Sequence, residues 1–159
     1  MLTHARATGA ARHAPEPPLQ PCPPDGGLMQ EIGDVDGEHI VLLGKDGPDL
    51  MCALVRAGAL EVAHLAAPER LQADSASMVI VPVLPSADWL ASALPSLRRA
   101  MLPNARIILR AQATADALGA KRIRKLLALH GYDRIRAIRR GEWLVTSAEL
   151  PAFGLRKAA

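Results

Sequence analysis

The stretch His39–Leu50 constrains the fold most, because it combines a short apolar run, a glycine turn and a proline. Residues Ile40–Leu43 are continuously apolar, which is typical of a strand covered on both faces of a parallel sheet. The segment Gly44–Gly47 then predicts a tight turn, and Pro48 suits the first position of a helix, where a missing N–H costs nothing. The stretch therefore predicts a strand–turn–helix junction of an α/β domain.

Strands and helices are expected to alternate through the rest of the chain. A helix follows Pro48 and ends at Gly58. Further strands are predicted at Glu61–Leu65, Met78–Leu84 and Ala105–Leu109, because each is short and mostly apolar. The first of these connections makes a βαβ unit, which is right-handed in nearly all proteins.

Three prolines refine these expectations. Pro82 cannot donate to a central ladder, so the third strand is expected to stop at Val81. Ser86 is a good cap for the next helix, and Pro95 predicts a kink or a break inside that helix. Pro103-Asn104 predicts a turn before the fourth strand.

The last part of the chain predicts a helix and a hairpin. Thr114 would cap a helix that runs to about His130. The segments Asp133–Ile138 and Glu142–Ser147 flank a short turn, which is typical of an antiparallel pair. The predicted fold class is therefore α/β, with three layers and a mostly parallel sheet of about six strands that ends in an antiparallel hairpin.

Composition divides the chain into two tails and one domain. Residues 1–27 contain six prolines, and proline removes backbone donors, so a disordered N-terminal tail is expected. Residues 28–150 are expected to form a single α/β domain that is large enough to bury its own core. Residues 151–159 are predicted to be a C-terminal tail.

Cysteine usage and hydropathy indicate the compartment. Cys22 and Cys52 lie in unlike settings, and neither has the Cys or His spacing of a zinc site. No run approaches the roughly eighteen apolar residues of a membrane span. We therefore expect a cytoplasmic protein that holds no metal and does not cross a membrane.

The formal charge of +3 conceals an asymmetry. Between Arg98 and Arg140 the chain has twelve Lys or Arg and two Asp, a net charge of +10, which leaves −7 for the rest. Such a segment can form a surface for nucleic acid or another anionic partner, although ordinary solvated faces have the same composition. The candidate residues for that surface are Arg122, Lys125, Arg136, Arg139 and Arg140.

The order of elements from about residue 38 to 148 resembles that of class I S-adenosylmethionine-dependent methyltransferases. In that family a leucine-rich helix leads through a proline-glycine turn into a strand, and a later Gly-Phe or Gly-Tyr turn leads into the final antiparallel pair. The stretches LRRAMLPNARIIL and LLALHGYDRIRAIRRGEWLVTSA carry this pattern. The matching positions are Leu97, Leu102, Pro103, Arg106, Gly131 and Tyr132. The resemblance implies a Rossmann-like fold.

The resemblance also implies where S-adenosylmethionine would bind. The candidate cofactor-binding residues are Gly44, Lys45, Asp46, Gly47 and His64. The sequence departs from the family there, because the acid before the glycine-rich loop is absent and the second strand ends without the acid that would hold the ribose hydroxyls. Glu69 follows only later, and Pro82–Pro85 replaces the polar or acidic residues that end the family's fourth strand. The family's usual third strand also has no counterpart.

These departures favour a degenerate, non-catalytic methyltransferase-like domain that acts as a binding or assembly module. An active methyltransferase on an unknown substrate is one alternative, since methyl transfer depends more on positioning than on acid–base groups. A basic-faced protein that binds nucleic acid or another anionic partner is the second, and a homo-oligomer or a protein partner also fits the sequence. In the purely structural interpretation, Gly47 makes the turn and Asp46 or Asp49 caps the helix.

Overall fold

The computed structural model describes residues 28–44, 47–113 and 117–152, and every structural statement below refers to these residues. The predicted N-terminal tail and most of the predicted C-terminal tail lie outside them. So do Lys45, Asp46 and Thr114. No helix in the described part of the chain is long and apolar enough to cross a membrane.

The elements alternate between strand and helix as far as the final hairpin. In chain order they are α1 (Leu28–Ile32), β1 (His39–Leu43), α2 (Pro48–Arg56), β2 (Glu61–Leu65), the 3₁₀ helix η1 (Pro68–Arg70), β3 (Ala76–Val81), α3 (Ala87–Ala100), β4 (Met101–Gln112), α4 (Ala117–Leu129), β5 (Asp133–Arg140) and β6 (Trp143–Glu149).

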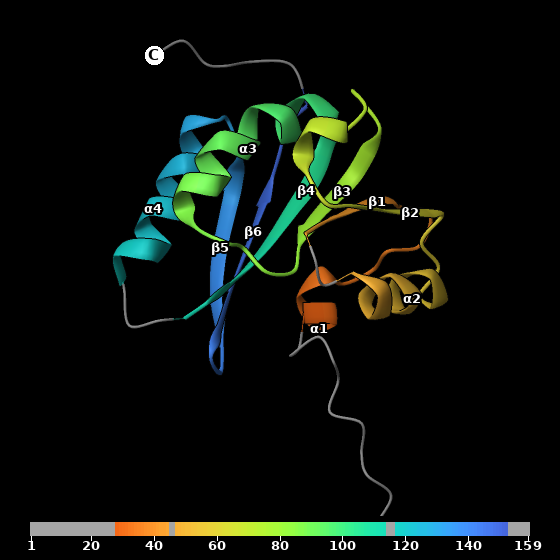
Figure 1. Ribbon diagram of the computed structural model, residues 1–159, viewed down its shortest axis with the longest axis horizontal. Coiled ribbons are helices and arrows are strands. Elements are labelled where there is room, and N and C mark those ends of the chain that lie inside the picture. Colours follow the sequence, from red (N-terminus) through yellow and green to blue (C-terminus); the bar gives the residue numbers. More distant parts are fainter. Residues whose placement is uncertain (1–27, 45–46, 114–116, 153–159) are drawn as a thin grey trace, which may run out of the picture.

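The strands form one sheet in the order β2-β1-β3-β4-β6-β5 (Figure 1). Strands β2, β1, β3 and β4 are parallel, and β6 and β5 join them as antiparallel strands. Helices α1 and α2 cover one face, and α3 and α4 cover the other. The predicted three-layer α/β fold with a terminal hairpin is therefore confirmed.

Each central strand contributes side chains to two separate cores. In β3, Val79 and Val81 pack under α3 and α4, whereas Met78 and Ile80 pack under α1 and α2. Burial on both faces explains why the strands read as continuous apolar runs rather than as an alternation of apolar and polar residues.

Several local predictions are confirmed. Strands β1 and β2 begin and end where predicted, and β3 ends at Val81, directly before Pro82. The Ser86 hydroxyl accepts a hydrogen bond from the Trp89 N–H at 3.0 Å and caps α3. Gly58 follows the C-cap of α2 with a φ of 102°, a conformation that favours glycine.

Two predictions about prolines were wrong in part or in whole. Helix α3 continues through Pro95 without the break, while the predicted kink stays a prediction; Pro95 lies on the exposed side, where water can bond the carbonyl that loses its N–H donor, and Leu90, Leu94 and Leu97 are fully buried on the other side. The segment Pro103-Asn104 is no turn but lies within β4.

A bulge explains why Pro103-Asn104 fits inside a strand. Met101 pairs with Ala76 and Arg106 pairs with Met78, so β4 has more residues than β3 between the two contacts. Asn104 adopts a φ of 63° there and absorbs part of the excess length.

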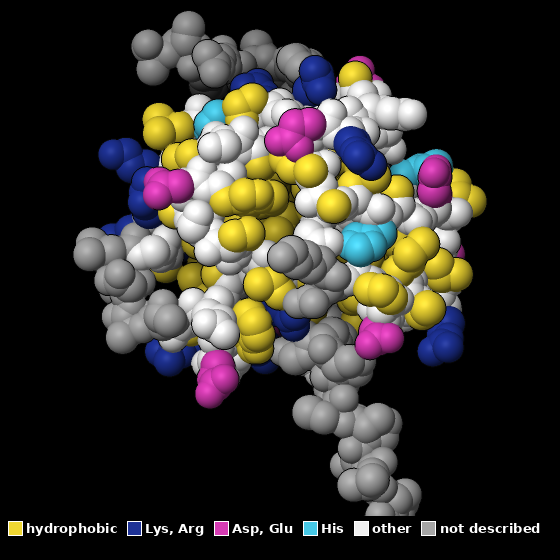
Figure 2. All heavy atoms as spheres, in the orientation of Figure 1, with side chains coloured by type: hydrophobic (Ala, Val, Ile, Leu, Met, Phe, Trp, Pro, Cys, Tyr) yellow, Lys and Arg dark blue, Asp and Glu magenta, His cyan; other side chains and the backbone are white. Residues whose placement is uncertain are grey.

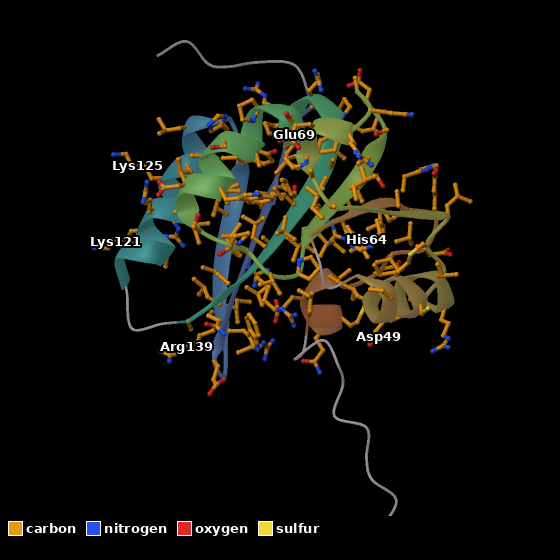
Figure 3. The ribbon with its side chains drawn as sticks, in the orientation of Figure 1. Asp49, His64, Glu69, Lys121, Lys125 and Arg139 are labelled. Carbon is orange, nitrogen blue, oxygen red and sulfur yellow. The ribbon has the colours of Figure 1, made fainter. Side chains whose placement is uncertain are left out.

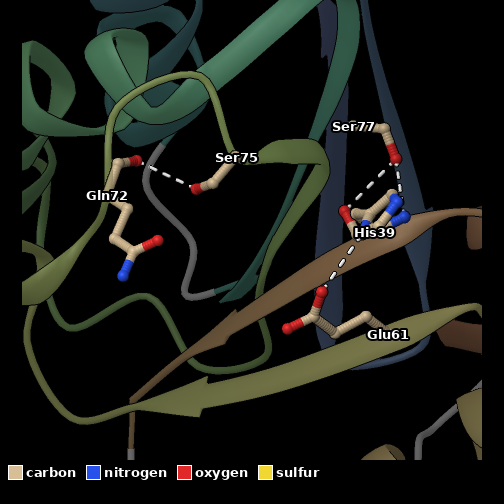
Figure 4. A network of polar contacts seen from close by, with 5 residues as sticks. All are labelled: His39, Glu61, Gln72, Ser75 and Ser77. Carbon is tan, nitrogen blue, oxygen red and sulfur yellow. Dashed lines mark hydrogen bonds and ion pairs between the residues drawn. The ribbon is translucent and has the colours of Figure 1, made fainter.

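A polar network joins the first strands at their amino-terminal ends (Figure 4). The Ser77 hydroxyl accepts from the His39 N–H at 2.9 Å and donates to the His39 carbonyl at 3.2 Å. The imidazole Nδ1 of His39 lies 3.2 Å from the Glu61 carboxylate. This network links β3, β1 and β2 at the edge of the sheet opposite to the candidate site described next.

Candidate functional site

The carboxyl-terminal ends of the parallel strands meet at one edge of the sheet. Strand β1 ends at Leu43, β2 at Leu65 and β3 at Val81. In open α/β sheets ligands bind outside these ends, where the connections to the following helices leave a crevice. The candidate cofactor residues belong to this carboxyl-terminal edge.

The His64 side chain connects β2 to the turn that follows β1 (Figure 3). Its Nε2 lies 2.5 Å from the Gly44 carbonyl oxygen, which accepts the hydrogen bond. The ring also lies against Gly47, because a Cβ added to that glycine would come within 2.5–2.6 Å of three ring atoms. Gly47 has a φ of −116°, which other residues also adopt, so a side chain at this position would meet no backbone strain but would meet the exposed imidazole of His64.

The structure therefore brings together Gly44, Gly47 and His64 of the predicted cofactor set, while Lys45 and Asp46 lie outside the described residues. Gly47 is the N-cap of α2 and no side chain caps that position, so capping by Asp49 is not what the structure shows. Pro48 takes the first helical position, so Asp49 lies inside the first turn of α2. There its negative charge stabilises the helix only through the positive amino-terminal end of the helix dipole.

The ends of β2 and β3 supply few polar groups to this edge. Strand β2 ends with His64 and Leu65. The next acidic residue along the chain is Glu69, on η1, and η1 packs against α3. Figure 3 shows Glu69 well separated from His64. Strand β3 leads into Pro82 and a partly exposed Val83.

These residues do not fit S-adenosylmethionine in the way that the resemblance implies. The imidazole of His64 occupies the space over Gly47, and no carboxylate stands at the end of β2 to accept hydrogen bonds from ribose hydroxyls. In the described residues no group of three or more His, Cys, Asp or Glu side chains could hold a metal ion.

Arg110 is a buried charged residue that the sequence did not single out. It is 7% exposed, and its Nε donates to the Pro82 carbonyl at 2.7 Å. Its guanidinium lies 4.5 Å from the centroid of the Trp143 ring. Arg110 thus ties the ends of β3 and β6 to β4. In a segment with so many arginines, the signal for burial is its place directly after the apolar run Ile107–Leu109, on the same face of β4 as Ile108.

A groove of about 740 Å³ opens at the same edge on the side of α3 and α4. Its walls are mostly apolar, and its polar members include Ser86, Gln112 and Arg139. Hydrophobic side chains gather over the middle of the face shown in Figure 2. Arg139 lines this groove, and its Nε donates to the Gly141 carbonyl at 3.3 Å.

The five basic candidates do not form one cluster. Arg122 and Lys125 are exposed on α4, where Arg122 forms an ion pair with Asp88 of α3. Arg136 and Arg139 belong to β5 and, by the alternation of a strand, face opposite sides of the sheet.

Arg140 is engaged elsewhere. Its guanidinium lies 2.5 Å from the Glu31 carboxylate of α1, on the face opposite α4. Among the described residues Lys125, Arg136 and Arg139 form no ion pair, so these three candidates keep a free charge.

The sheet order, the helices on both faces and the terminal antiparallel hairpin agree with the fold that the resemblance to class I S-adenosylmethionine-dependent methyltransferases implies, apart from the third strand of that family, which has no counterpart in the described residues. The predicted methyltransferase-like, Rossmann-like fold is therefore confirmed.

Comparison with solved structures supports this assignment of the fold. A ribosomal protein L11 methylase from Lactobacillus delbrueckii subsp. bulgaricus matches with a TM-score of 0.65 and 14% identity, over 80% of this chain and 77% of that one. An O-methyltransferase from Thermotoga maritima matches with a TM-score of 0.63 and 12% identity, over 84% and 67%. A methyltransferase from Mesorhizobium loti matches with a TM-score of 0.60 and 13% identity, over 77% and 95%.

Because the sequence identities to these three structures are only 12–14%, the comparisons show a similarity of fold alone. No protein-family model matches the sequence, and no curated protein matches it.

The contact between Gly47 and His64 gives a first testable prediction. Gly47→Ala is expected to lower the free energy of unfolding by about 1 kcal/mol, because the added methyl group displaces the imidazole and its hydrogen bond to Gly44 is lost. His64→Ala should cost a similar amount. The double variant should cost much less than the sum, since the displaced ring is already gone. Urea unfolding of the four proteins measures this coupling, and strictly additive costs would contradict the contact.

Proposed function

We propose that this domain is a binding or assembly module on a methyltransferase-like fold and that it does not transfer methyl groups. The observation that carries the proposal is the position of His64. Its imidazole is hydrogen-bonded to Gly44 and packed on Gly47, at the turn over which this fold would hold its cofactor.

The neighbouring strand ends support the same conclusion. Methyl transfer depends on a cofactor that is held and oriented, so losing the cofactor contacts weighs more than losing acid–base residues. No acid ends β2, and the first polar side chain after β3 is Ser86, whose hydroxyl caps α3. A methyltransferase-like fold that lacks the residues of the cofactor site is not expected to have methyltransferase activity, because function depends on the site rather than on the fold.

An assay with S-adenosylmethionine that is radiolabelled on the methyl group tests this proposal. The full chain is incubated with total RNA, total protein and the small molecules of a cell extract as acceptors. We expect no more label in any fraction than with heat-denatured protein. Incorporation of label that requires the folded chain would instead establish an active methyltransferase, provided that Gly47→Trp abolishes it. The indole of that variant would fill the space in which the cofactor would bind.

A second candidate function, binding to duplex nucleic acid, is favoured by the outer side of α4. The helix exposes Lys121, Arg122, Arg124 and Lys125, and only Arg122 forms an ion pair among the described residues. Figure 3 shows Lys121 and Lys125 projecting away from the body of the domain. Among the aromatic residues that the structure describes, Tyr132 is buried and both tryptophans are partly buried, so from this part of the chain we expect contacts to phosphates rather than to stacked bases.

The salt dependence of binding tests this second candidate. If α4 contacts phosphates, the affinity for duplex DNA falls steeply with added salt, and Lys121→Glu with Lys125→Glu lowers both the affinity and the slope, by about one unit of slope per lysine. The matched control, Arg56→Glu with Arg70→Glu, changes two exposed arginines on other elements, α2 and η1, and should have little effect. No binding at low salt would remove the candidate.

A further inference from the structure

The groove beside α3 and α4 is built from parts of the chain that lie far apart in the sequence. One wall is the connection from β3 to α3, with Val83 and Leu84, and the other is the first part of α4, with Ala120 and Ile123. Its volume of about 740 Å³ falls in the range of about 300–1,000 Å³ that is typical of pockets for small molecules. The groove is therefore large enough for a small organic molecule.

A row of three paired residues crosses the sheet along this groove. Ala111 of β4 pairs with Leu144 of β6, and Leu144 pairs with Arg139 of β5. All three residues line the groove. Directly paired residues of neighbouring strands point to the same face of a sheet, so the Arg139 side chain lies on the face that α4 covers, beside two apolar residues.

The groove presents apolar surface to solvent. Val83 is 36% exposed, and Ala120 and Leu144 are partly exposed. Gly119 also lines the groove, and a Cβ added to it would meet no neighbouring atom within 4 Å. Removal of apolar surface from water is favourable in proportion to its area, so these walls favour a ligand with an apolar body.

Arg139 is the single charged residue among the described residues that line the groove. Its Nε donates to the Gly141 carbonyl at 3.3 Å, and within the described part of the chain its guanidinium forms no ion pair. The other guanidinium N–H groups can therefore donate to a carboxylate, in the strong hydrogen bonds that two charged partners make.

The acidic residues next to the groove in the sequence leave this positive charge in place. Asp88 follows the groove residue Ala87, but its carboxylate forms an ion pair with Arg122 of α4. Glu142, in the turn of the hairpin, does not line the groove and forms no ion pair with Arg139. The described lining of the groove thus combines apolar walls with one positive charge.

We propose that this groove binds a small apolar carboxylate. The carboxylate pairs with Arg139, and the apolar part lies between Val83 and Ile123, over Ala111 and Leu144. The inference rests on the proposed function of the domain as a binding module and names the class of its ligand. A cationic ligand would meet the charge of Arg139 without an acidic partner, and a neutral apolar ligand would leave that charge unpaired.

Titration calorimetry of the full chain with three ligands tests the proposal. Octanoate, octanol and octylammonium share one alkyl chain and differ in the charge of the head group. We expect octanoate to bind with a dissociation constant below about 1 mM, octanol to bind about tenfold more weakly, and octylammonium not to bind. Octanol or octylammonium that binds as tightly as octanoate would overturn the proposal. So would no heat with any of the three ligands, the result expected if the groove held a protein segment instead.

Matched variants test the position of the ligand. Arg139→Gln should weaken octanoate binding about tenfold and leave octanol binding unchanged, which also shows that the variant is folded. Its control is Arg136→Gln, on the same strand but facing the other side of the sheet. Ala120→Phe should fill the groove and weaken both ligands, whereas Ala128→Phe, at an exposed position of α4 outside the groove, should weaken neither. Equal effects within either pair of variants would contradict the assignment.

The assay with radiolabelled S-adenosylmethionine separates a failure of this inference from a failure of the proposed function. No octanoate binding together with no methyl transfer would remove the ligand class and leave the non-catalytic assignment in place. Methyl transfer by the folded chain would overturn the non-catalytic assignment, and the inference that rests on it, whatever the titration with octanoate shows.

Discussion

Replacing Arg110 with methionine is expected to lower the free energy of unfolding by about 2–4 kcal/mol. The guanidinium is almost fully buried, donates to the Pro82 carbonyl at 2.7 Å and stacks on Trp143. Methionine keeps most of the packing volume but leaves a buried carbonyl without its charged donor, and hydrogen bonds from charged groups are among the strongest. Urea unfolding followed by tryptophan fluorescence measures the loss.

The control for this variant is Arg136→Met on the edge strand β5. Arg136 is exposed and forms no ion pair within the described residues, so its replacement should change the stability by less than about 0.5 kcal/mol. Equal losses in the two variants would show that Arg110 contributes no more than a surface arginine.

The stability of the domain should fall steeply above about pH 10, because of Tyr132. Burial raises the pKa of the Tyr132 phenol well above its ordinary value, and the nearby Arg98 lowers it to a smaller extent. The folded state therefore keeps a proton that the unfolded state releases. The contribution of the protonated phenol to the free energy of unfolding is fully present below the pKa that tyrosine has in the unfolded chain. It is lost as the pH rises from there toward the pKa in the folded state, and the free energy of unfolding falls by about 1.4 kcal/mol per pH unit.

The chain contains a single tyrosine, so ultraviolet absorbance of tyrosinate reports on this residue alone. We expect the absorbance to rise together with unfolding rather than at the ordinary pKa. Tyr132→Phe loses the hydrogen bond to the Met101 sulfur at 3.2 Å but should also lose this part of the alkaline sensitivity. A tyrosine that ionises near pH 10 in the folded protein would contradict its buried state.

The architecture was largely predictable because its signals are local. A continuous apolar run, a turn and a helix with proline at its start defined β1 and α2, and the alternation of elements defined the layers. Pro103-Asn104 was misread because a turn signal and a bulge signal have the same composition, and only the pairing of β4 with β3 distinguishes them.

The candidate site was predictable only in position. The sequence places Gly47 and His64 next to different strands, but nothing in it indicates that the imidazole would lie on the glycine. Arg110 and Arg136 have similar sequence surroundings, yet one is buried and the other exposed, because burial of β4 and β5 depends on which strands lie next to them. The domain boundaries at residues 28 and 150 remain predictions.

The central claim, that His64 takes the place of a cofactor at the β1–α2 turn, is tested most directly by calorimetry. The full chain is titrated with S-adenosylmethionine and with S-adenosylhomocysteine, and thermal unfolding is followed at the same concentrations. We predict no heat of binding and no increase in melting temperature at millimolar ligand. Saturable binding with a dissociation constant in the micromolar range would contradict the claim.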